Sequence, residues 1–339
     1  GRVKGASDPR ATVYVKKVIE CGTNWVAMQR YKWAVMIYCA AVLCVGGFFY
    51  IRTAAASERA MLYNRERNDR AVDLSRGRQE YPLLVSGVVS QDEIAVLNAF
   101  ADYLSENAGY PLRIMAVASY THLTQALQEN PAALGWVCGL PYVQDRQSLN
   151  LQLVAVPLLN GKPTYESWVI ARMGRPERRL REFRGAVFGY SDIRSNSGYL
   201  APQYALARSG IDINTFFSKQ VWCRNHVGSI EAVMAGLVDV AAVDEYIYLQ
   251  YRKTHPDVDK QVQILQRFGP FPFTPIVAGE GVPPEMVARL KKALQGMPQT
   301  EQGRRLLEQM GLDGFVEVEP EFYRPIEQRW RYVQKQIGE

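Results

Sequence analysis

Short apolar runs alternate with amphipathic stretches through residues 82–339, and this alternation predicts an α/β fold. Residues 82–90 (PLLVSGVVS) are expected to form a strand. Residues 92–109 carry apolar side chains at a spacing near 3.6, which predicts a helix. Further strands are expected at 111–117, 151–159, 167–173, 185–190, 219–223, 238–244 and 274–280, and further helices at 283–297 and 300–311.

Two segments of this pattern resemble each other. Residues 120–143 and 226–249 both run from a polar opening through a helix-like stretch to an apolar strand. Cys138 and Asp244 follow the two strands at equivalent places. Because the carboxyl ends of strands in open α/β sheets face the ligand crevice, we expect both side chains to face one cleft between two lobes.

An uncharged apolar run occupies residues 33–51 and lies outside this pattern. As a helix it would be about 28 Å long, close to the hydrocarbon thickness of a bilayer. Two interpretations stand side by side: an uncleaved transmembrane anchor, or the apolar core of a signal peptide that starts at Met28 and ends at the small residues 54–56. In both, the basic flank stays in the cytoplasm and the rest of the chain lies outside the cytoplasmic membrane.

The positive charge of the chain is concentrated in this flank. The 339 residues carry a net charge of +6, and residues 1–32 account for +5 of it, through seven Lys or Arg against Asp8 and Glu20. The remainder is close to neutral, which does not favour a nucleic-acid partner. Residues 52–81 are rich in charge and are expected to form a spacer. Residues 82–339 are numerous enough for two lobes with their own cores.

The stretch Ser195-Asn196-Ser197-Gly198-Tyr199 places hydroxyls and a glycine between a strand-like run and a helix-like run. One interpretation is a helix N-cap, because serine and asparagine oxygens accept the free N–H groups of a first turn. The other is an anion site, because a helix start attracts negative charge and Gly198 lets the backbone approach a ligand closely.

Motifs for catalysis are missing from the sequence. It contains no Walker-type loop, no G-x-G-x-x-G, no G-x-S-x-G and no H-E-x-x-H, and its three histidines lack metal-ligand spacing. A hydrolase that uses Ser197 and His226 is the enzymatic alternative, but no base-orienting acid stands at a recognisable spacing. The sequence therefore predicts a binding protein without catalytic residues, metal or cofactor.

Residues 192–212 (DIRSNSGYLAPQYALARSGID) and 226–244 (HVGSIEAVMAGLVDVAAVD) resemble the phosphate/phosphonate-type, PhnD-like periplasmic binding proteins of ABC transporters. Residues 135–143 (GWVCGLPYV) resemble a first-lobe strand and loop of that family. The resemblance implies a two-lobed type II periplasmic-binding-protein fold behind the N-terminal transmembrane or signal helix. Lobe one is expected at 82–170 plus 275–339, and lobe two at 171–274.

The resemblance also implies a site and a function. Ser195, Asn196 and Ser197 are expected to contact the oxygens of a small oxyanion, phosphonate, phosphate or similar, which an ABC transporter permease then receives. Tyr120 and Tyr142 would close the site from lobe one, while His226 and Asp244 would complete it from lobe two. Two positions depart from the family pattern, since Asn196 stands where threonine is frequent and Arg224 replaces a small residue.

Cys138 and Cys223 are the cysteines that follow the apolar run, and we expect both to end strands that point at the cleft. They are interpreted as buried structural thiols, as an exported disulfide, or as soft ligands for a metalloid. Some relatives of the family bind arsenite through a cysteine and serve a sensor kinase. The second functional hypothesis is therefore a sensory binding protein for a thiophilic oxyanion, anchored to the inner membrane through residues 33–51.

Overall fold

The computed structural model describes residues 80–86 and 91–337. The chain separates into residues 1–77 and 78–339, and all described residues belong to the second unit. The predicted basic flank, the apolar run 33–51 and nearly all of the spacer lie outside the described residues, so the anchor and the signal peptide both stay predictions. Within the described part of the chain, every helix is too short or too polar to cross a bilayer.

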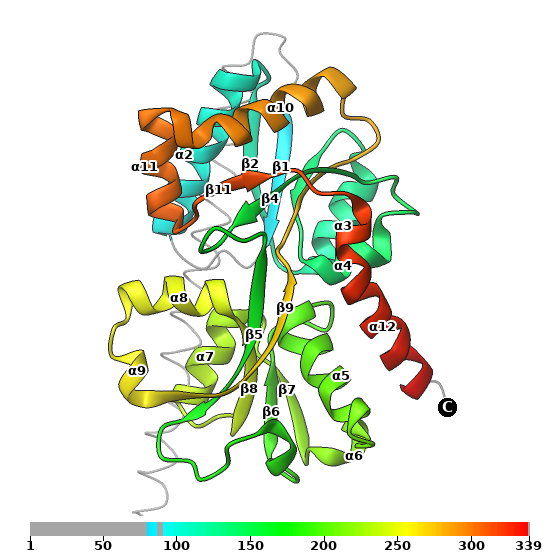
Figure 1. The fold of residues 1–339 in the computed structure, drawn as a ribbon, viewed down its shortest axis with the longest axis vertical. Helices are drawn as coiled ribbons and strands as arrows, with labels where there is room; N and C mark the ends of the chain where they lie inside the picture. The colour runs from blue at the N-terminus through cyan, green and yellow to red at the C-terminus, as the bar shows by residue number, and fades with distance from the viewer. Residues whose placement is uncertain (1–79, 87–90, 338–339) are drawn as a thin grey trace, which may run out of the picture. The chain divides into compact units, whose positions relative to one another are not determined.

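The first of two sheets has six strands in the order β11-β4-β10-β3-β1-β2 (Figure 1). β1 pairs in parallel with β2 and β3, whereas β10 runs antiparallel to β3 and β4. The strands are β1 (Tyr81–Ser86), β2 (Leu112–Val117), β3 (Leu134–Trp136), β4 (Gln152–Leu158), β10 (Ile276–Ala278) and β11 (Gly314–Val316).

Two groups of helices cover the six-stranded sheet (Figure 1). In the first group α2 (Gln91–Ala108) packs with α10 (Pro284–Gly296) and α11 (Glu301–Met310). In the second, α3 (Tyr120–Glu129) packs with α4 (Gly139–Asp145). A last helix, α12 (Arg324–Ile337), packs on α4 and also on α5 (Ala201–Arg208) of the other sheet's half. Their ends follow from local chemistry: Thr300 caps α11 by accepting from Gly303 N at 3.0 Å, and Gly311 ends it with a φ of 66°.

The second sheet has five strands in the order β7-β6-β8-β5-β9. They are β5 (Thr164–Arg172), β6 (Val187–Tyr190), β7 (Lys219–Trp222), β8 (Val240–Asp244) and β9 (Val262–Pro272). The helices of this half are α5 (Ala201–Arg208), α6 (Ile213–Phe216), α7 (His226–Met234), α8 (Glu245–Thr254) and α9 (Val258–Gln261). Successive residues of β5 and β8 enter apolar clusters on opposite faces, with α7 and α8 on one face and α5 and α6 on the other. Residues 168–171 of β5 and 240–243 of β8 are all apolar because both faces of the strands are buried there.

The chain passes between the two sheets twice (Figure 1). It leaves the six-stranded sheet after β4 and returns to it at β10. The predicted boundary at residue 170 falls inside β5, which pairs over its length with strands of the five-stranded sheet. The apolar pattern of residues 167–173 identifies a buried strand without showing which sheet it joins. The bounds of the lobes themselves remain a prediction.

The internal repeat is confirmed. α3 leads into β3, which is parallel to β1, and α7 leads into β8, which is parallel to β6. Cys138 stands at the N-cap of α4, and Asp244 stands at the N-cap of α8. Both residues therefore lie at the junction between a strand that has a parallel partner and the helix that follows it.

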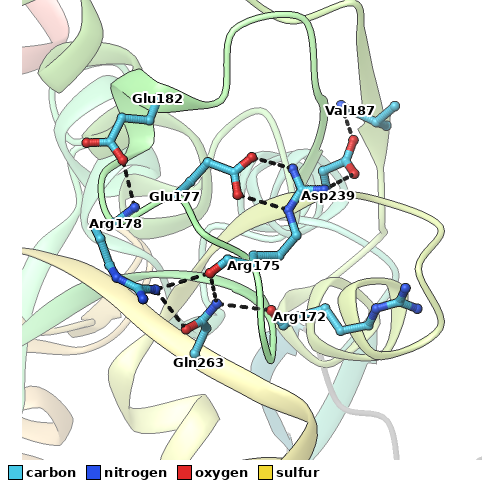
Figure 2. A network of polar contacts seen from close by, with 8 residues as sticks. All are labelled: Arg172, Arg175, Glu177, Arg178, Glu182, Val187, Asp239 and Gln263. Atoms are coloured by element: carbon cyan, nitrogen blue, oxygen red, sulfur yellow. Dashed lines mark hydrogen bonds and ion pairs between the residues drawn. The ribbon is translucent and has the colours of Figure 1, made fainter.

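A polar network closes the end of the five-stranded sheet at which β6 and β8 begin (Figure 2). Asp239 accepts from Val187 N at 2.8 Å and pairs with Arg175 at 3.5 Å. Arg175 also forms a two-pronged ion pair with Glu177, at 2.7 and 3.1 Å. Gln263 Nε2 donates to the carbonyls of Arg172 and Arg175 at 3.2 and 2.9 Å. The network therefore attaches the loop after β5 to the starts of β6, β8 and β9.

Replacing Asp239 with alanine is expected to lower the free energy of unfolding by about 1–2 kcal/mol, because the Val187 N–H loses its acceptor. Chemical denaturation measures this change. The matched control is Asp257→Ala, which breaks the exposed pair with Lys260 and should change stability by less than about 0.5 kcal/mol. Equal losses in the two variants would contradict the assigned role of Asp239.

Candidate functional site

The Ser-Asn-Ser-Gly segment forms one wide helical turn, Asn196–Leu200, that leads into α5. Ser195 caps this turn by accepting from Gly198 N at 2.9 Å. Ser195, Asn196 and Ser197 are fully buried. The helix-cap interpretation is thus confirmed for Ser195, while the other two side chains have no capping bond and call for another explanation.

Gly198 is required by its surroundings. A Cβ at this position would lie 2.1 Å from Ser191 Oγ and 3.1 Å from His226 Cε1. The turn therefore packs directly against Ser191 and the His226 ring, so the glycine serves close packing within the site.

His226 is a buried, neutral hydrogen-bonding residue at the start of α7. Burial lowers its pKa to about 3. Its Nδ1 accepts from Asp244 N at 3.1 Å, so we assign the ring proton to Nε2, which lies 3.3 Å from Ser195 Oγ. Ser195 Oγ then accepts from both His226 and Gly198, and its own proton is available to a ligand oxygen.

Asp244 presents a buried carboxyl group to the same region. Its Oδ1 caps α8 by accepting from Tyr246 N at 2.8 Å and Ile247 N at 3.3 Å. Within the described residues, no hydrogen bond reaches Oδ2. Burial raises the pKa of Asp244 to about 7, and the two backbone donors oppose that rise. Near neutral pH this carboxyl group can therefore either accept or donate a proton.

Two polar atoms of the turn, Asn196 Oδ1 and Ser197 Oγ, are buried and have no partner at hydrogen-bonding geometry among the described residues, although Ser197 lies close enough to the Tyr165 phenol to lower its pKa. The rest of Asn196 is engaged, since its Nδ2 donates to Tyr165 Oη at 3.0 Å and its backbone N donates to Cys138 Sγ at 3.4 Å. Buried polar atoms without partners are rare in folded proteins and call for a specific explanation, such as a ligand.

Tyr120 and Cys138 bring the six-stranded sheet's elements to this cluster. Burial raises the pKa of Tyr120 well above its usual range, and nearby Cys138, Asp244 and Tyr165 raise it further. Burial also raises the pKa of Cys138 to about 11, so its thiol is neutral. Seven of the eight predicted site residues therefore meet around the turn: Tyr120, Cys138, Ser195, Asn196, Ser197, His226 and Asp244.

The eighth, Tyr142, is not part of this cluster. Its ring packs edge-on against Tyr323 with centroids 4.7 Å apart, inside the core of the six-stranded sheet. Tyr142 lies inside α4, and its side chain packs against Tyr323 rather than against the turn. Tyr165 supplies the buried phenol that Tyr142 was expected to supply.

Cys223 also departs from expectation. It packs against the apolar cluster between β6 and α7, its Sγ contacts the Val221 carbonyl at 3.7 Å, and both it and Cys138 are free thiols. The prediction that both thiols face one cleft is wrong for Cys223, because the strand end turns its side chain into the core. The disulfide alternative is not realised in this structure.

Sequence reasoning missed three residues that hold the site. Tyr165 and Ser167 of β5 both reach the turn, since Tyr165 Oη accepts from Asn196 Nδ2 and Ser167 Oγ donates to the Ser197 carbonyl at 2.7 Å. Asp192 Oδ2 accepts from Tyr120 N at 3.3 Å. A serine inside an apolar strand was the available signal for the β5 pair.

A family model described as ABC transporter, phosphonate, periplasmic substrate-binding protein matches residues 85–323. A curated protein, the probable ABC transporter phosphite binding protein PhnD1 of Prochlorococcus marinus strain MIT 9301, is 22% identical over 165 residues. That match covers 47% of this chain and 56% of the relative, so the chain spans little more than half the length of this relative.

Two solved structures have a similar fold. A binding protein component of an ABC phosphonate transporter from Pseudomonas aeruginosa superposes with a TM-score of 0.70 at 19% identity, over 76% of this chain and 87% of that one. PhnD1 from Prochlorococcus marinus, solved in complex with methylphosphonate, gives a TM-score of 0.69 at 18% identity, over 76% of this chain and 98% of its own. At these identities the likeness shows the two-sheet α/β fold of periplasmic binding proteins.

Proposed function

Because the chain belongs to the family of periplasmic substrate-binding proteins of phosphonate ABC transporters, we propose that it captures a small oxyanion of the phosphonate and phosphate class. The proposed site is the buried cluster around Ser195, Asn196 and Ser197, completed by Tyr120, Cys138, His226 and Asp244. Tyr142 was predicted for the same site, and the proposal now gives its place to Tyr165.

The observation that carries the proposal is a pair of buried atoms without a hydrogen-bond partner among the described residues: Ser197 Oγ, which can donate to a ligand oxygen, and Asn196 Oδ1, which can accept from a protonated one. They lie near the hydroxyl groups of Ser195, in the same turn, and of Tyr165, which accepts from Asn196 Nδ2, and the protons of both hydroxyls can turn towards a ligand. Neutral donors suit a tetrahedral oxyanion, because they bind its oxygens without the desolvation cost of a buried cation. Asp244 adds one carboxyl group that can share a proton with a ligand oxygen.

The proposal places the ligand in a cleft that closes between two lobes. Tyr120 and Cys138 belong to elements of the six-stranded sheet, whereas Ser195, Ser197 and Asp244 belong to elements of the five-stranded sheet. A ligand held from both sides can stabilise a closed arrangement only through contacts that the open arrangement lacks.

The proposed setting is the periplasm, and the proposed partner is the permease of an ABC transporter. Members of the family are periplasmic substrate-binding proteins, which requires export of the globular part. Residues 33–51 would provide that export, as a signal peptide or as an anchor, and they lie outside the described residues.

The thiols of the structure do not favour an arsenite sensor as a second function. Cys138 is the thiol of the cluster, and Cys223, the other described cysteine, is partly buried and packs against a separate apolar cluster. Cys138 Sγ already accepts from Asn196 N, and burial raises the pKa of the thiol to about 11, so the cluster offers a single, protonated soft ligand.

Replacing Ser197 with alanine is expected to weaken methylphosphonate binding by about 1–3 kcal/mol, roughly tenfold to a hundredfold. The same change should leave the ligand-free protein as stable as before or slightly more stable, because it removes a buried hydroxyl without a partner. Calorimetric titration and thermal unfolding of the full chain measure the two effects.

Ser105→Ala is the matched control. Ser105 Oγ donates to the Ala101 carbonyl at 2.7 Å and accepts from Leu112 N at 2.8 Å, far from the cluster in α2. Its loss should lower stability by about 1 kcal/mol and leave affinity unchanged. Unchanged affinity in the Ser197 variant would return Ser197 to a purely structural role.

A further inference from the structure

Arg194 lies in the loop that follows β6, directly before Ser195 and the turn Asn196–Leu200. Because the proposed function assigns the ligand to residues 195–197, we call residues 195–200 the ligand-contacting turn. The backbone N of Arg194 donates to Asp192 Oδ1 at 2.8 Å, which fixes the loop locally. Its side chain leaves the five-stranded sheet's half and reaches α3 and α4, which cover the six-stranded sheet. It is therefore a bridge between elements of the two sheets.

Three hydrogen bonds engage the guanidinium group. Nη2 donates to Asp145 Oδ2 at 2.6 Å, Nη1 donates to Thr124 Oγ1 at 2.7 Å, and Nε donates to Gln144 Oε1 at 2.9 Å. Thr124 Oγ1 in turn donates to Asp145 Oδ2 at 2.6 Å, which closes the network. The side chains of Arg194 and Asp145 are each only 16% exposed. We call these four residues the Arg194 network.

The Arg194 network connects the segments that carry the proposed site. Tyr120 is the first residue of α3, and Cys138 directly precedes α4. Ser195 follows Arg194 in the chain, so one guanidinium group holds the ligand-contacting turn against both helices. None of the network's side chains belongs to the cluster itself.

Because of this position, the guanidinium bonds of the Arg194 network exist only while α3 and α4 lie against the five-stranded sheet's half. Charge-assisted hydrogen bonds in a mostly buried pair are stronger than those of exposed surface pairs. If the five-stranded sheet moved away from α3 and α4, all three guanidinium bonds would break together, because each acceptor lies on the other side. The bonds can therefore stabilise only the arrangement in which Cys138 and Asn196 are in contact, at 3.4 Å.

We propose that Arg194 is a positioning residue, which holds the ligand-contacting turn against α3 and α4 and slows release of the bound oxyanion. The identity of the ligand in this inference rests on the proposed function. The inference goes further, because it assigns control of the ligand's release rate to residues that do not touch the ligand.

The test compares Arg194→Gln with Arg146→Gln in the full chain. Arg146 is a matched control, because it pairs with Glu327 at 3.0 Å with side-chain exposures of 20% and 19%, and this pair joins the end of α4 to α12 without involving the turn or the loop after β6. Release of methylphosphonate is followed by stopped-flow displacement. Arg194→Gln should accelerate release at least tenfold, whereas Arg146→Gln should lower the melting temperature without changing the release rate.

A double-variant cycle separates positioning from general destabilisation. Asp145→Asn should accelerate release, and adding it to Arg194→Gln should change the rate by less than twofold, because the shared bond is already lost. Wild-type release in Arg194→Gln, or equal acceleration in Arg146→Gln, would overturn the inference.

Failure of the proposed function would be distinguishable. If the wild type binds neither methylphosphonate nor phosphate, the proposed ligand is wrong, and the radius of gyration of the ligand-free proteins decides the role of Arg194. A larger radius in Arg194→Gln than in wild type and Arg146→Gln would support the bridge, and equal radii would overturn it.

Discussion

Replacing Gly198 with alanine is expected to abolish measurable oxyanion binding and to destabilise the protein by about 1–3 kcal/mol or more. The added Cβ would lie 2.1 Å from Ser191 Oγ and 3.1 Å from His226 Cε1, and Ser191 is buried. Rotation of the Ser191 hydroxyl relieves only the shortest contact, because Ser191 Cβ would also lie 3.1 Å from the added Cβ. The turn or the His226 ring must therefore still move, and either movement displaces Ser195 from its bonds to Gly198 N and His226 Nε2.

Calorimetric titration with methylphosphonate and thermal unfolding would measure these effects. Gly296→Ala is the matched control, because a Cβ there would meet nothing nearer than Gln299 Oε1 at 3.9 Å and the backbone needs no glycine. That variant should bind normally and be as stable as wild type or more stable. Normal ligand affinity in the Gly198 variant would contradict the claim that the turn has no room for a Cβ at this position.

Replacing Asp244 with asparagine is expected to remove most of the pH dependence of ligand binding. Burial raises the pKa of Asp244 to about 7. Phosphonates lose their second proton near neutral pH, as phosphate esters do. Above that range the wild type must take up one proton to bind, so its affinity should fall about tenfold per pH unit. In Asp244→Asn an amide N–H replaces the shared proton, so affinity should change less than about threefold between pH 7 and 9.

The same substitution should alter stability in a separate pH window. An unfolded aspartate ionises near pH 4, whereas the buried Asp244 does so at about 7. The folded state therefore holds its proton longer, and wild-type stability should fall as pH rises from about 4 to about 7 and then level off. Asp244→Asn should lack this decline while keeping the α8 cap through its side-chain oxygen. Chemical denaturation across the window measures it, and identical slopes in the two proteins would contradict the assigned pKa.

The local sequence pattern predicted those helices and strands whose apolar residues follow a regular helical or strand periodicity. The helix-to-strand units ending near Cys138 and Asp244 were visible because helical and strand periodicities follow one another twice. β9 was not predicted, because most of its positions are half-buried without a regular alternation and it contains Gly269 and Pro270, which are typical of turns.

The site was predictable where its residues are contiguous in the chain. Ser195, Asn196 and Ser197 form one turn, whereas the choice between Tyr142 and Tyr165 depends on which face of α4 or β5 meets that turn. Arg194 could not be paired with Asp145 from sequence, because the two are 49 residues apart and meet only after both sheets have formed. Burial of Asp244, and hence its raised pKa, depends on the same assembly.

The proposal that the buried turn is an oxyanion site is tested most directly by calorimetric titration of the full chain with methylphosphonate, alongside Ser197→Ala. The account predicts saturable binding at one site in the wild type and binding weakened by at least tenfold in the variant. Absence of heat and of thermal stabilisation with methylphosphonate, phosphite and phosphate alike, or equal affinity in the two proteins, would contradict it.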